Sequence, residues 1–589
     1  MATAVDTDVL IIGAGSSGLG LAIQLKRKLG HDNFRIIEKS SGVGGTWLAN
    51  TYPGCGCDVK SHFYSYSFAL NPDWTRVYSM QPEIQAYFES LTRQYDLYPK
   101  ISFNSAVETA VWQPNAQRWL VIIKDLERKT TYTLTARAVV ASVGLLSIPK
   151  PCTIPGAESF DGKIFHSGNW DASFNWTDKK VVVVGNGCSA TQFVPIMTRT
   201  GPENHPTSGP VRQLVQFSRQ PHYLAERENP SYSKMFKRIM RYVPLAMRLY
   251  RFTIYASMEA DFAGFHIKNG QKIRDGLARE NEEYVHKMAP KKYWDYLIPP
   301  YQIGCKRKVL DTDYLACLWR ENMELIPDDG IAHIEPNGVR TRNGRLVEAD
   351  AIVLATGYEL HQFLFPMKIV GDSGIDLEQH WKIHSQGAPA AYLGTVTSGF
   401  PNFFTLMGPN TVTGHASVVY TSECQILMTL GLLAPILSHS PSIPLLSSPQ
   451  KPTAVSVTPA AAARDFELTH SRLKNYVWST GCTSWALDPG SGLNIAMYHH
   501  YQWHYWLRCL FLKRSHFKYQ FPTKTGWASR FIVVGFGWVY LRRAVSAALL
   551  VVLTAWGVRI GSEGRRDALE RAVGLIRAVV GRAKGLVGK

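Results

Sequence analysis

The sequence predicts an α/β protein with two Rossmann-like dinucleotide-binding domains, a helical insertion and a C-terminal hydrophobic tail. Two stretches carry the prediction, because in each a short apolar run is followed by a glycine-rich turn and then by apolar residues at helical spacing. The first stretch begins at Asp8 and the second at Val181. With 589 residues, the chain is also long enough for two or three domains.

The first glycine-rich turn is Gly13-Ala14-Gly15-Ser16-Ser17-Gly18, directly after the apolar run 8–12. In this pattern Gly13 makes the tight turn, Gly15 lets the backbone approach a pyrophosphate, and Gly18 lets helix and strand pack closely. The phosphate then meets a helix N-terminus, where free N–H groups favour an anion. A second apolar run, 34–37, ends at Glu38, an acid placed to accept a ribose hydroxyl. We therefore expect a dinucleotide here.

The second glycine-rich turn is Gly185-Asn186-Gly187-Cys188-Ser189-Ala190, a variant of the same pattern that ends in alanine. The next apolar run, 212–217, ends on Ser218-Arg219 instead of an acid. An arginine there suits the 2′-phosphate of NADPH and would find nothing to pair with on NAD. The loop 201–210 makes the spacing between the turn and this arginine longer than the spacing between the first turn and Glu38. The second nucleotide is nevertheless predicted to be NADPH.

Composition and charge exclude several other classes of protein. A hydrophobic content of 45% and the absence of a short repeat argue against disorder and solenoids. The net charge of +18 is concentrated in residues 513–589, which hold fifteen lysines and arginines against three acids, so we expect no nucleic-acid partner. The nine cysteines suggest no disulfide framework and no metal site, and we expect a reducing, cytosol-facing location. Cys55 and Cys57 are interpreted as packed thiols rather than a redox couple.

A longer motif lies just before the second turn. Residues 160–171, FDGKIFHSGNWD, fit the pattern F-x-G-x-x-x-H-x-x-x-W-D. Further segments agree, in chain order: GGTW at 44–47, YPG at 52–54 with CD at 57–58, SYSF at 65–68, LATGY at 354–358, PN at 401–402 and GPN at 408–410. Over about residues 8–500 the chain resembles the type I Baeyer–Villiger monooxygenases, a branch of the class B flavoprotein monooxygenases. Trp170 and Asp171 favour this branch over the related N- and S-oxygenating enzymes.

The resemblance implies FAD at the first turn, NADPH at the second, and oxygen insertion beside the carbonyl of an apolar ketone through a flavin C4a-peroxide. Such chemistry needs a fixed cation near developing negative charge. Arg307 matches the family's catalytic arginine, Asp58 the aspartate that orients it, and Lys306 the lysine that reads the NADPH phosphate. His166 is expected to hold the link between the domains rather than to transfer protons.

The turns and the resemblance together give the predicted cofactor contacts. For FAD they are Gly13, Gly15, Ser17, Gly18, Glu38, Thr46, Trp47, Leu48, Ala49, Asp58, Tyr64 and Val107. For NADPH they are Gly56, Cys57, Asp58, Gly185, Asn186, Gly187, Cys188, Ser189, Ala190, Thr191, Ser218, Arg219, Lys306 and Trp485. The chain departs from the family pattern at Val143, at Gln220 and in the loop 488–490, which leaves the cofactors in place but obscures the shape of the substrate site.

The FAD-binding domain is expected in two pieces, 1–150 and 350–520, around an NADPH-binding domain at 151–349. Within the latter, residues 230–301 are interpreted as a helical insertion whose basic face is either solvated or in contact with a membrane. Residues 521–589 hold two apolar runs, 531–541 and 544–558, separated by two arginines and followed by a basic amphipathic end. These runs are short for a membrane span, so we expect a shallow or short-span anchor followed by a basic helix at the membrane surface, with a packed hairpin as the alternative.

Two other functions stay open on the sequence alone. Oxygenation at N or S, or hydroxylation, would use the same flavin intermediate and differ only in the product. A membrane-tethered FAD-binding protein without oxygenase activity belongs to a different class, and substrate-dependent oxygen incorporation would exclude it. The identity of the substrate and the oligomeric state are not encoded in any of these patterns.

Overall fold

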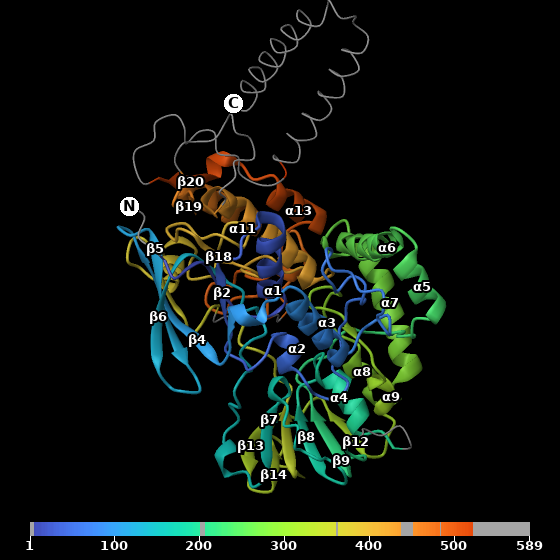
Figure 1. The fold of residues 1–589 in the computed structure, drawn as a ribbon. Coiled ribbons are helices and arrows are strands. Elements are labelled where there is room, and N and C mark those ends of the chain that lie inside the picture. The colour runs from blue at the N-terminus through green and yellow to red at the C-terminus, as the bar shows by residue number, and fades with distance from the viewer. Residues whose placement is uncertain are drawn as a thin grey trace, which may run out of the picture.

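A computed structural model of the chain describes residues 5–200, 207–360, 363–437, 451–482, 485–521 and 537. The predicted tail, 521–589, therefore lies outside the described residues, apart from Phe521 and Gly537. Figure 1 shows two α/β units, one above the other, with a group of helices along one side of both. The predicted α/β class with Rossmann-type sheets is confirmed.

The larger sheet is assembled from chain segments on both sides of the smaller one. Its strand order is β17-β4-β5-β6-β1-β2-β3, and β18 pairs with β6. The strands are β1 Thr7–Ile12, β2 Phe34–Ile37, β3 Ile101–Ser102, β4 Ser105–Gln113, β5 Arg118–Asp125, β6 Thr131–Ala141, β17 Lys368–Val370 and β18 Phe403–Thr405. β1 pairs in parallel with β2 and β6, and α1 (Ser16–Gln24) leaves β1 through the first glycine-rich turn. α1 packs against α11 (Val418–Leu437).

The second sheet has the order β12-β9-β8-β16-β7, and all of its neighbouring strands are parallel. The strands are β7 Lys163–His166, β8 Lys180–Val184, β9 Gln213–Phe217, β12 Met323–Ile326 and β16 Ala351–Leu354. The expected boundary at 350 is therefore too early. β16 is a fully buried apolar strand between β7 and β8, and so the second unit extends through Leu354.

The remaining elements connect and cover these sheets. Three small sheets are formed by β10 Leu224–Ala225 with β11 Val309–Leu310, by β13 Ile331–Glu335, β14 Gly338–Thr341 and β15 Leu346–Glu348, and by β19 Ala454–Val457 with β20 Phe517–Gln520. Further helices are α2 Thr46–Ala49, α3 Gln81–Gln94, α4 Ala190–Met197, α9 Tyr314–Cys317, α10 Leu377–His384, α12 Pro459–Leu473 and α13 Gln502–Leu510. Among the described helices only α11 is long and apolar enough to cross a membrane, and 78% of its most apolar window is buried inside the protein.

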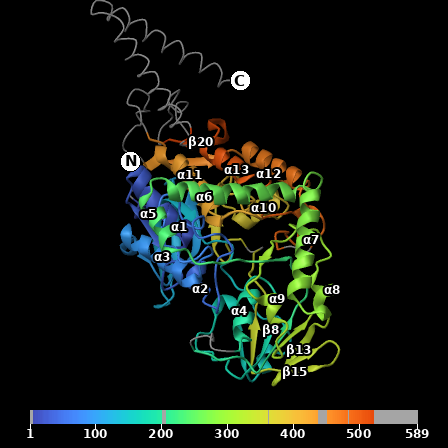
Figure 2. The same cartoon turned by 90° about the vertical axis from the view of Figure 1, so that its right-hand side faces the viewer.

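Residues 230–301 contain α5 Lys234–Tyr242, α6 Ala246–Ala260, α7 Gln271–Met288 and α8 Trp294–Leu297. Figures 1 and 2 show these helices along one side of the molecule, with α6 running below α13. Arg251 of α6 fixes them to the first unit, because its Nη1 donates to the carbonyl oxygens of His62 and Phe63 at 2.9 and 3.1 Å. Its Nη2 also lies 3.6 Å from a carboxylate oxygen of Glu423 on α11.

Two chain segments join the two units. One runs from β6 to β7 and the other from β16 to β17. They lie antiparallel, since the N–H of Lys150 donates to the Gly357 carbonyl at 3.0 Å and the N–H of Glu359 to the Ile148 carbonyl at 2.8 Å. The connection between the units is therefore a hydrogen-bonded double segment.

Candidate functional site

The first glycine-rich turn has the geometry that its glycines predict. Gly13 adopts φ +102°, and its N–H donates to the Ile37 carbonyl at 2.8 Å. A β-carbon on Gly18 would lie 1.9 Å from the Gly13 carbonyl oxygen, so only glycine allows α1 to approach the turn this closely. The carboxylate of Glu38 is buried at the same turn and accepts the N–H of Ala14 at 2.6 Å.

A second pair of glycines closes the same turn from the other side. A β-carbon on Gly45 would lie 3.0 Å from the α-carbon of Gly15, so a side chain there would fill the space between the two segments. α2 starts at Thr46, directly after Gly45, and the indole N–H of Trp47 donates to the Tyr64 hydroxyl at 3.0 Å. A bare backbone cradle beside paired aromatic rings fits a dinucleotide with a planar ring.

The other predicted FAD contacts are spread around this region. Val107 is buried on β4, while Thr46 and Ala49 are exposed at the two ends of α2. Leu48 lies between them and is half-buried. The structure therefore joins Trp47 with Tyr64, and it places Val107 in the sheet core, packed among Leu10, Ile37 and their neighbours.

The second glycine-rich turn is shaped like the first but is more open. Gly185 adopts φ +109°, and a β-carbon on it would lie 2.5 Å from the Ala355 carbonyl oxygen. A β-carbon on Gly187 would meet no atom within 4 Å, so the backbone there faces open space. The side-chain amide of Asn186 donates to the Gln220 carbonyl at 3.0 Å. This turn therefore has room for a phosphate at the start of α4.

Two cations lie together beside the second turn. Arg219 is exposed just beyond the end of β9. Burial, and then the nearby charge of Arg219, lower the pKa of Lys306. The ammonium of Lys306 donates to the Gln220 side chain and lies 4.8 Å from the centre of the Tyr301 ring. Like charges that act on one another favour an anion between them, and a phosphate dianion has the matching charge.

Asp58 and Arg307 form an ion pair although 249 residues separate them in the chain. Nε of Arg307 donates to Oδ2 of Asp58 at 2.6 Å, and the two side chains are 31% and 32% exposed. The charge of Asp58 raises the pKa of the Arg307 guanidinium, which keeps it protonated. The thiol of Cys188 is exposed at the second turn and lies within reach of the charges of Asp58 and Arg307. The pair therefore lies next to the second turn.

Gln192 of α4 connects the two units at this point, and sequence reasoning did not single it out. Its Oε1 accepts the Tyr52 hydroxyl at 3.0 Å and the Gly56 N–H at 3.3 Å, while its Nε2 donates to the Gly56 carbonyl at 3.1 Å. Nη2 of Arg227 donates to the carbonyl oxygen of Cys57 at 3.1 Å. The one available signal was a polar residue inside an apolar helical run.

The motif at 160–171 is a structural connection in this fold. Nδ1 of His166 accepts the Gly168 N–H at 2.9 Å, and burial lowers the pKa of this histidine. Its ring meets the Tyr358 ring edge-on at 5.7 Å, and the Tyr358 hydroxyl donates to Oδ1 of Asn50 at 2.7 Å. Trp170 packs edge-on against Phe165 at 5.1 Å. These contacts agree with the expected linking role of His166.

The cysteines differ from the expectation in one respect. Cys305 and Cys482 form a disulfide with their α-carbons 6.3 Å apart. They are 177 residues apart in the chain, so no spacing in the sequence indicated the pair. Cys55 and Cys57 are separate buried thiols, as expected, and burial raises the pKa of Cys55 to about 11. Within the described ranges, no group of three His, Cys, Asp or Glu side chains could hold a metal ion.

Trp485 lies a few residues beyond the disulfide and is 38% exposed. With Leu145, Phe363 and Pro409 it lines a small apolar cavity of about 20 Å³. No hydrogen bond or ring contact between described residues joins it to the second turn. The structure thus brings together Asp58, Arg307 and the second turn, and leaves Trp485 outside that group.

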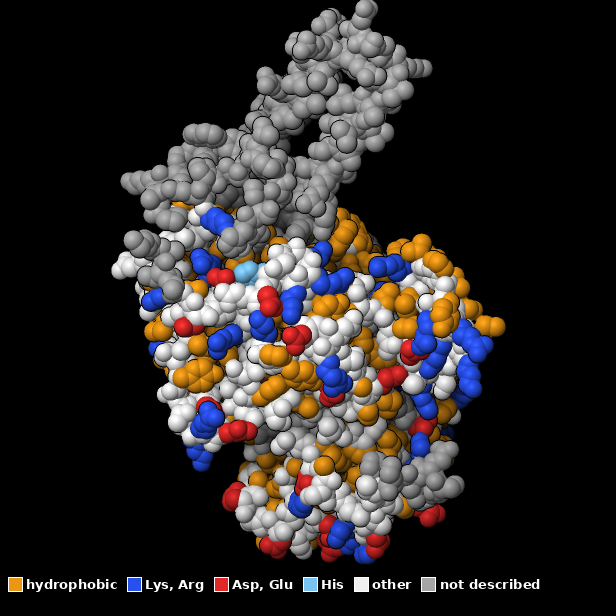
Figure 3. All heavy atoms as spheres, in the orientation of Figure 1, with side chains coloured by type: hydrophobic (Ala, Val, Ile, Leu, Met, Phe, Trp, Pro, Cys, Tyr) orange, Lys and Arg blue, Asp and Glu red, His pale blue; other side chains and the backbone are white. Residues whose placement is uncertain are grey.

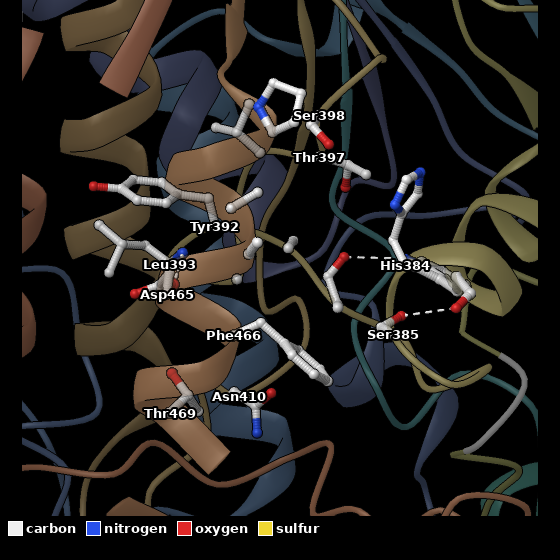
Figure 4. A pocket seen from close by; sticks show the side chains of 18 of the residues that line it. His384, Ser385, Tyr392, Leu393, Thr397, Ser398, Asn410, Asp465, Phe466 and Thr469 are labelled. Atoms are coloured by element: carbon white, nitrogen blue, oxygen red, sulfur yellow. Dashed lines mark hydrogen bonds between the residues drawn. The ribbon is translucent and has the colours of Figure 1, made fainter. Parts of the chain in front are cut away.

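A larger cavity of about 100 Å³ lies between α10 and α12. Figure 4 shows Phe466 pointing into it from α12, opposite His384 and Ser385. Asp465 on its wall is already satisfied by the Leu393 N–H at 2.9 Å and by Arg508 at 2.5 Å. Neither Asp58 nor Arg307 lines this cavity, so it is separate from the candidate site.

Comparison with known proteins places these features in context. Residues 6–203 match the model of the family described as flavin-binding monooxygenase-like. The chain is 37% identical over 499 residues to a Baeyer-Villiger monooxygenase from Pseudomonas aeruginosa, covering 84% of this chain and 88% of that protein. It is 34% identical over 492 residues to a Baeyer-Villiger monooxygenase from Streptomyces coelicolor, covering 83% and 88%. Among solved structures, OTEMO in complex with FAD and NADP has a similar fold, with a TM-score of 0.75, 22% identity, and coverage of 88% of this chain and all of that one.

Proposed function

Because the chain belongs to the Baeyer–Villiger monooxygenases of the flavin-binding monooxygenase-like family, we propose that its substrate is an apolar ketone, which it converts to an ester or lactone. The protein is an FAD- and NADPH-dependent monooxygenase. One NADPH and one proton reduce one O2 for each turnover. One oxygen atom enters the bond between the carbonyl carbon and its neighbour, and the other leaves as water.

The ion pair of Asp58 and Arg307 is the observation that carries this proposal. Arg307 is kept protonated by its neighbour, and the 2.6 Å contact fixes the direction of the guanidinium. A guanidinium that is already oriented stabilises developing negative charge without a reorganisation cost. We assign Arg307 the catalytic role toward the substrate oxygen, and Asp58 the role of orienting it.

When bound, FAD supplies two-electron redox chemistry with O2, and NADPH supplies the electrons. For FAD, we propose the cradle of Gly13, Gly15, Ser17 and Gly18 with Glu38 for the ribose, and the pair Trp47 and Tyr64 beside the ring. Thr46, Leu48, Ala49 and Val107 complete the proposed contacts. The buried Trp47 and Tyr64 exclude water from one side of this region.

For NADPH, we propose that Gly185 to Thr191 hold the pyrophosphate and that Arg219 with Lys306 binds the 2′-phosphate. The mutual approach of these two cations supports the choice of NADPH over NADH, since NADH offers no dianion to them. Gly56, Cys57 and Ser218 complete this site near the pair of Asp58 and Arg307. Trp485 is proposed to reach the nucleotide from the segment that follows the disulfide.

We further propose the split organisation of the FAD-binding domain around the NADPH-binding domain. The larger sheet supports it, because β17 and β18 join strands from the first part of the chain. The proposal for residues 521–589 is association with a membrane surface, facing the cytosol. It rests on the sequence, since these residues combine apolar runs with a strong excess of arginine and lysine.

Substitution of Arg307 by alanine tests the function directly. We expect Arg307→Ala to bind FAD and to be reduced by NADPH, but to release no ester or lactone, as judged by product NMR. The matched control is Arg320→Ala, because Arg320 supports the second unit through the Pro195 carbonyl and lies outside the proposed site. Normal ester formation by Arg307→Ala would remove the basis of the proposal.

A further inference from the structure

The hairpin of α5 and α6 carries large apolar side chains on its outer surface. Met235, Ile239 and Tyr242 follow one another at helical spacing on α5. Leu245 lies directly before α6, and Leu249 and Phe252 lie on α6. These six side chains, which we call the hairpin surface, are between 42% and 74% exposed. Figure 3 shows hydrophobic and basic side chains intermixed over this edge of the molecule. Large apolar side chains gathered on an exposed surface in this way mark a site of interaction.

The exposure of the hairpin surface does not result from poor packing of the two helices, because their opposite faces pack against the first unit. The ring of His62 from the first unit is surrounded by Tyr232, Phe236 and Tyr250, with ring centres 5.2 to 5.7 Å away. Arg251 anchors α6 to the His62 carbonyl at 2.9 Å. The outer side chains are therefore held outward by a rigid support.

The charged residues of the hairpin itself are all basic over 231–258. Residues 231–258 contain six lysines and arginines and no aspartate or glutamate. Three of the six point toward the body of the protein: Arg251 faces Glu423, and Lys237 and Arg241 both bind Asp73. The other three, Lys234, Arg238 and Arg248, are exposed and form no ion pair with any described residue.

The positive charge of these three residues determines which partner can bind to the hairpin surface. A second copy of the chain would bring the same three cations against these, and residues 513–589 carry fifteen basic residues against three acidic ones. Both occupants would be repelled. We propose that the hairpin surface docks on an anionic phospholipid bilayer, with the apolar side chains at the acyl boundary and the three cations at the headgroup phosphates.

The neighbouring helix adds the residue type that favours a membrane interface. Trp503 and Trp506 of α13 are 44% and 37% exposed and lie three residues apart. The N–H of Trp503 donates to Oε1 of Glu259 at the end of α6 at 2.9 Å. Figure 2 shows α13 directly beside α6. Tryptophan is enriched where an apolar phase meets water, so α13 extends the same docking face.

Hydrogen exchange of the full-length holoenzyme with vesicles tests the proposal at this surface, separately from residues 521–589. The probes are vesicles of phosphatidylcholine with about 30% phosphatidylserine, and vesicles of phosphatidylcholine alone. We expect the amides of residues 234–260 to be protected by the anionic vesicles and not by the neutral ones. Leu249→Ser with Phe252→Ser should weaken the binding, so that about tenfold more anionic vesicle is needed for the same protection.

The matched control for the apolar change is Ile383→Ser on α10, since Ile383 is 65% exposed and lies outside the hairpin. This variant should keep full protection. Lys234→Glu with Arg238→Glu and Arg248→Glu should abolish the protection. Lys129→Glu with Lys179→Glu should preserve it, because these two lysines are exposed but lie outside the hairpin. Equal protection by neutral vesicles, or no loss in the hairpin variants, would overturn the proposal. Protection that rises with protein concentration without vesicles would overturn it in favour of self-association.

Discussion

Loss of the Arg219 side chain separates the two nicotinamide cofactors in a measurable way. Arg219 is exposed beside Lys306, and its charge lowers the pKa of that lysine, so the two cations share one neighbourhood. A charge-assisted hydrogen bond contributes about 1.5 to 3 kcal/mol, which corresponds to roughly tenfold to hundredfold in affinity. Because Arg219 is open to solvent and Lys306 remains, we expect Arg219→Ala to lie near the lower end, about tenfold.

The assay is steady-state oxidation of NADPH and of NADH at saturating ketone. For Arg219→Ala we expect a KM for NADPH raised about tenfold, with little change for NADH, because NADH lacks the 2′-phosphate. Lys306→Ala should act in the same direction, and the double variant should lose most of the preference for NADPH. An equal rise in KM for both cofactors would refute the assignment of these cations to the 2′-phosphate.

Three other changes test different parts of the structure. Gly187→Ala should unfold at the wild-type temperature, since its β-carbon meets no atom within 4 Å, but it should raise the KM for both NADPH and NADH because the new methyl group occupies the space of the phosphate. Gly185→Ala should instead lower the unfolding temperature, because Gly185 adopts φ +109°. Burial and then the charge of Arg251 lower the pKa of His62 from 6.5 to about 4. As the pH falls, His62 is protonated in the unfolded chain before it is protonated in the folded protein. The free energy of unfolding is therefore unaffected by His62 above pH 6.5 and falls by up to about 3 kcal/mol as the pH drops to 4. In urea titrations His62→Gln should remove this pH dependence. Arg251→Met removes the arginine that pairs with Glu423 and leaves this carboxylate with only the weaker effect of the Lys28 charge, so it should cost about 3 kcal/mol in urea unfolding. Arg248→Met on the same helix should cost little.

Local signals in the sequence were sufficient for the nucleotide-binding units. The run that forms β1 and the turn at Gly13 are read from adjacent residues, because strand, turn and helix follow one another without a break. β2 also coincides with the predicted run that ends at Glu38. These elements depend on local backbone geometry, so the pattern contains what determines them.

Contacts between residues that are far apart in the chain could not be predicted from local sequence patterns. The pairing of Asp58 with Arg307 was expected only through a family resemblance, because no local pattern spans 249 residues. The disulfide of Cys305 with Cys482 and the bridge made by Gln192 were missed for the same reason. The second unit also extends past the expected boundary, because an apolar run such as β16 does not indicate which of two sheets it will join.

The double segment between the units determines how they can move. A single linker would let one unit rotate about any axis and twist relative to the other. Two antiparallel segments joined by the hydrogen bonds of Lys150 and Glu359 form a two-stranded ribbon, which bends more easily perpendicular to its plane than it twists. We therefore expect any movement between the units to follow one swinging direction, which would keep Arg307 of one unit aligned with Asp58 of the other.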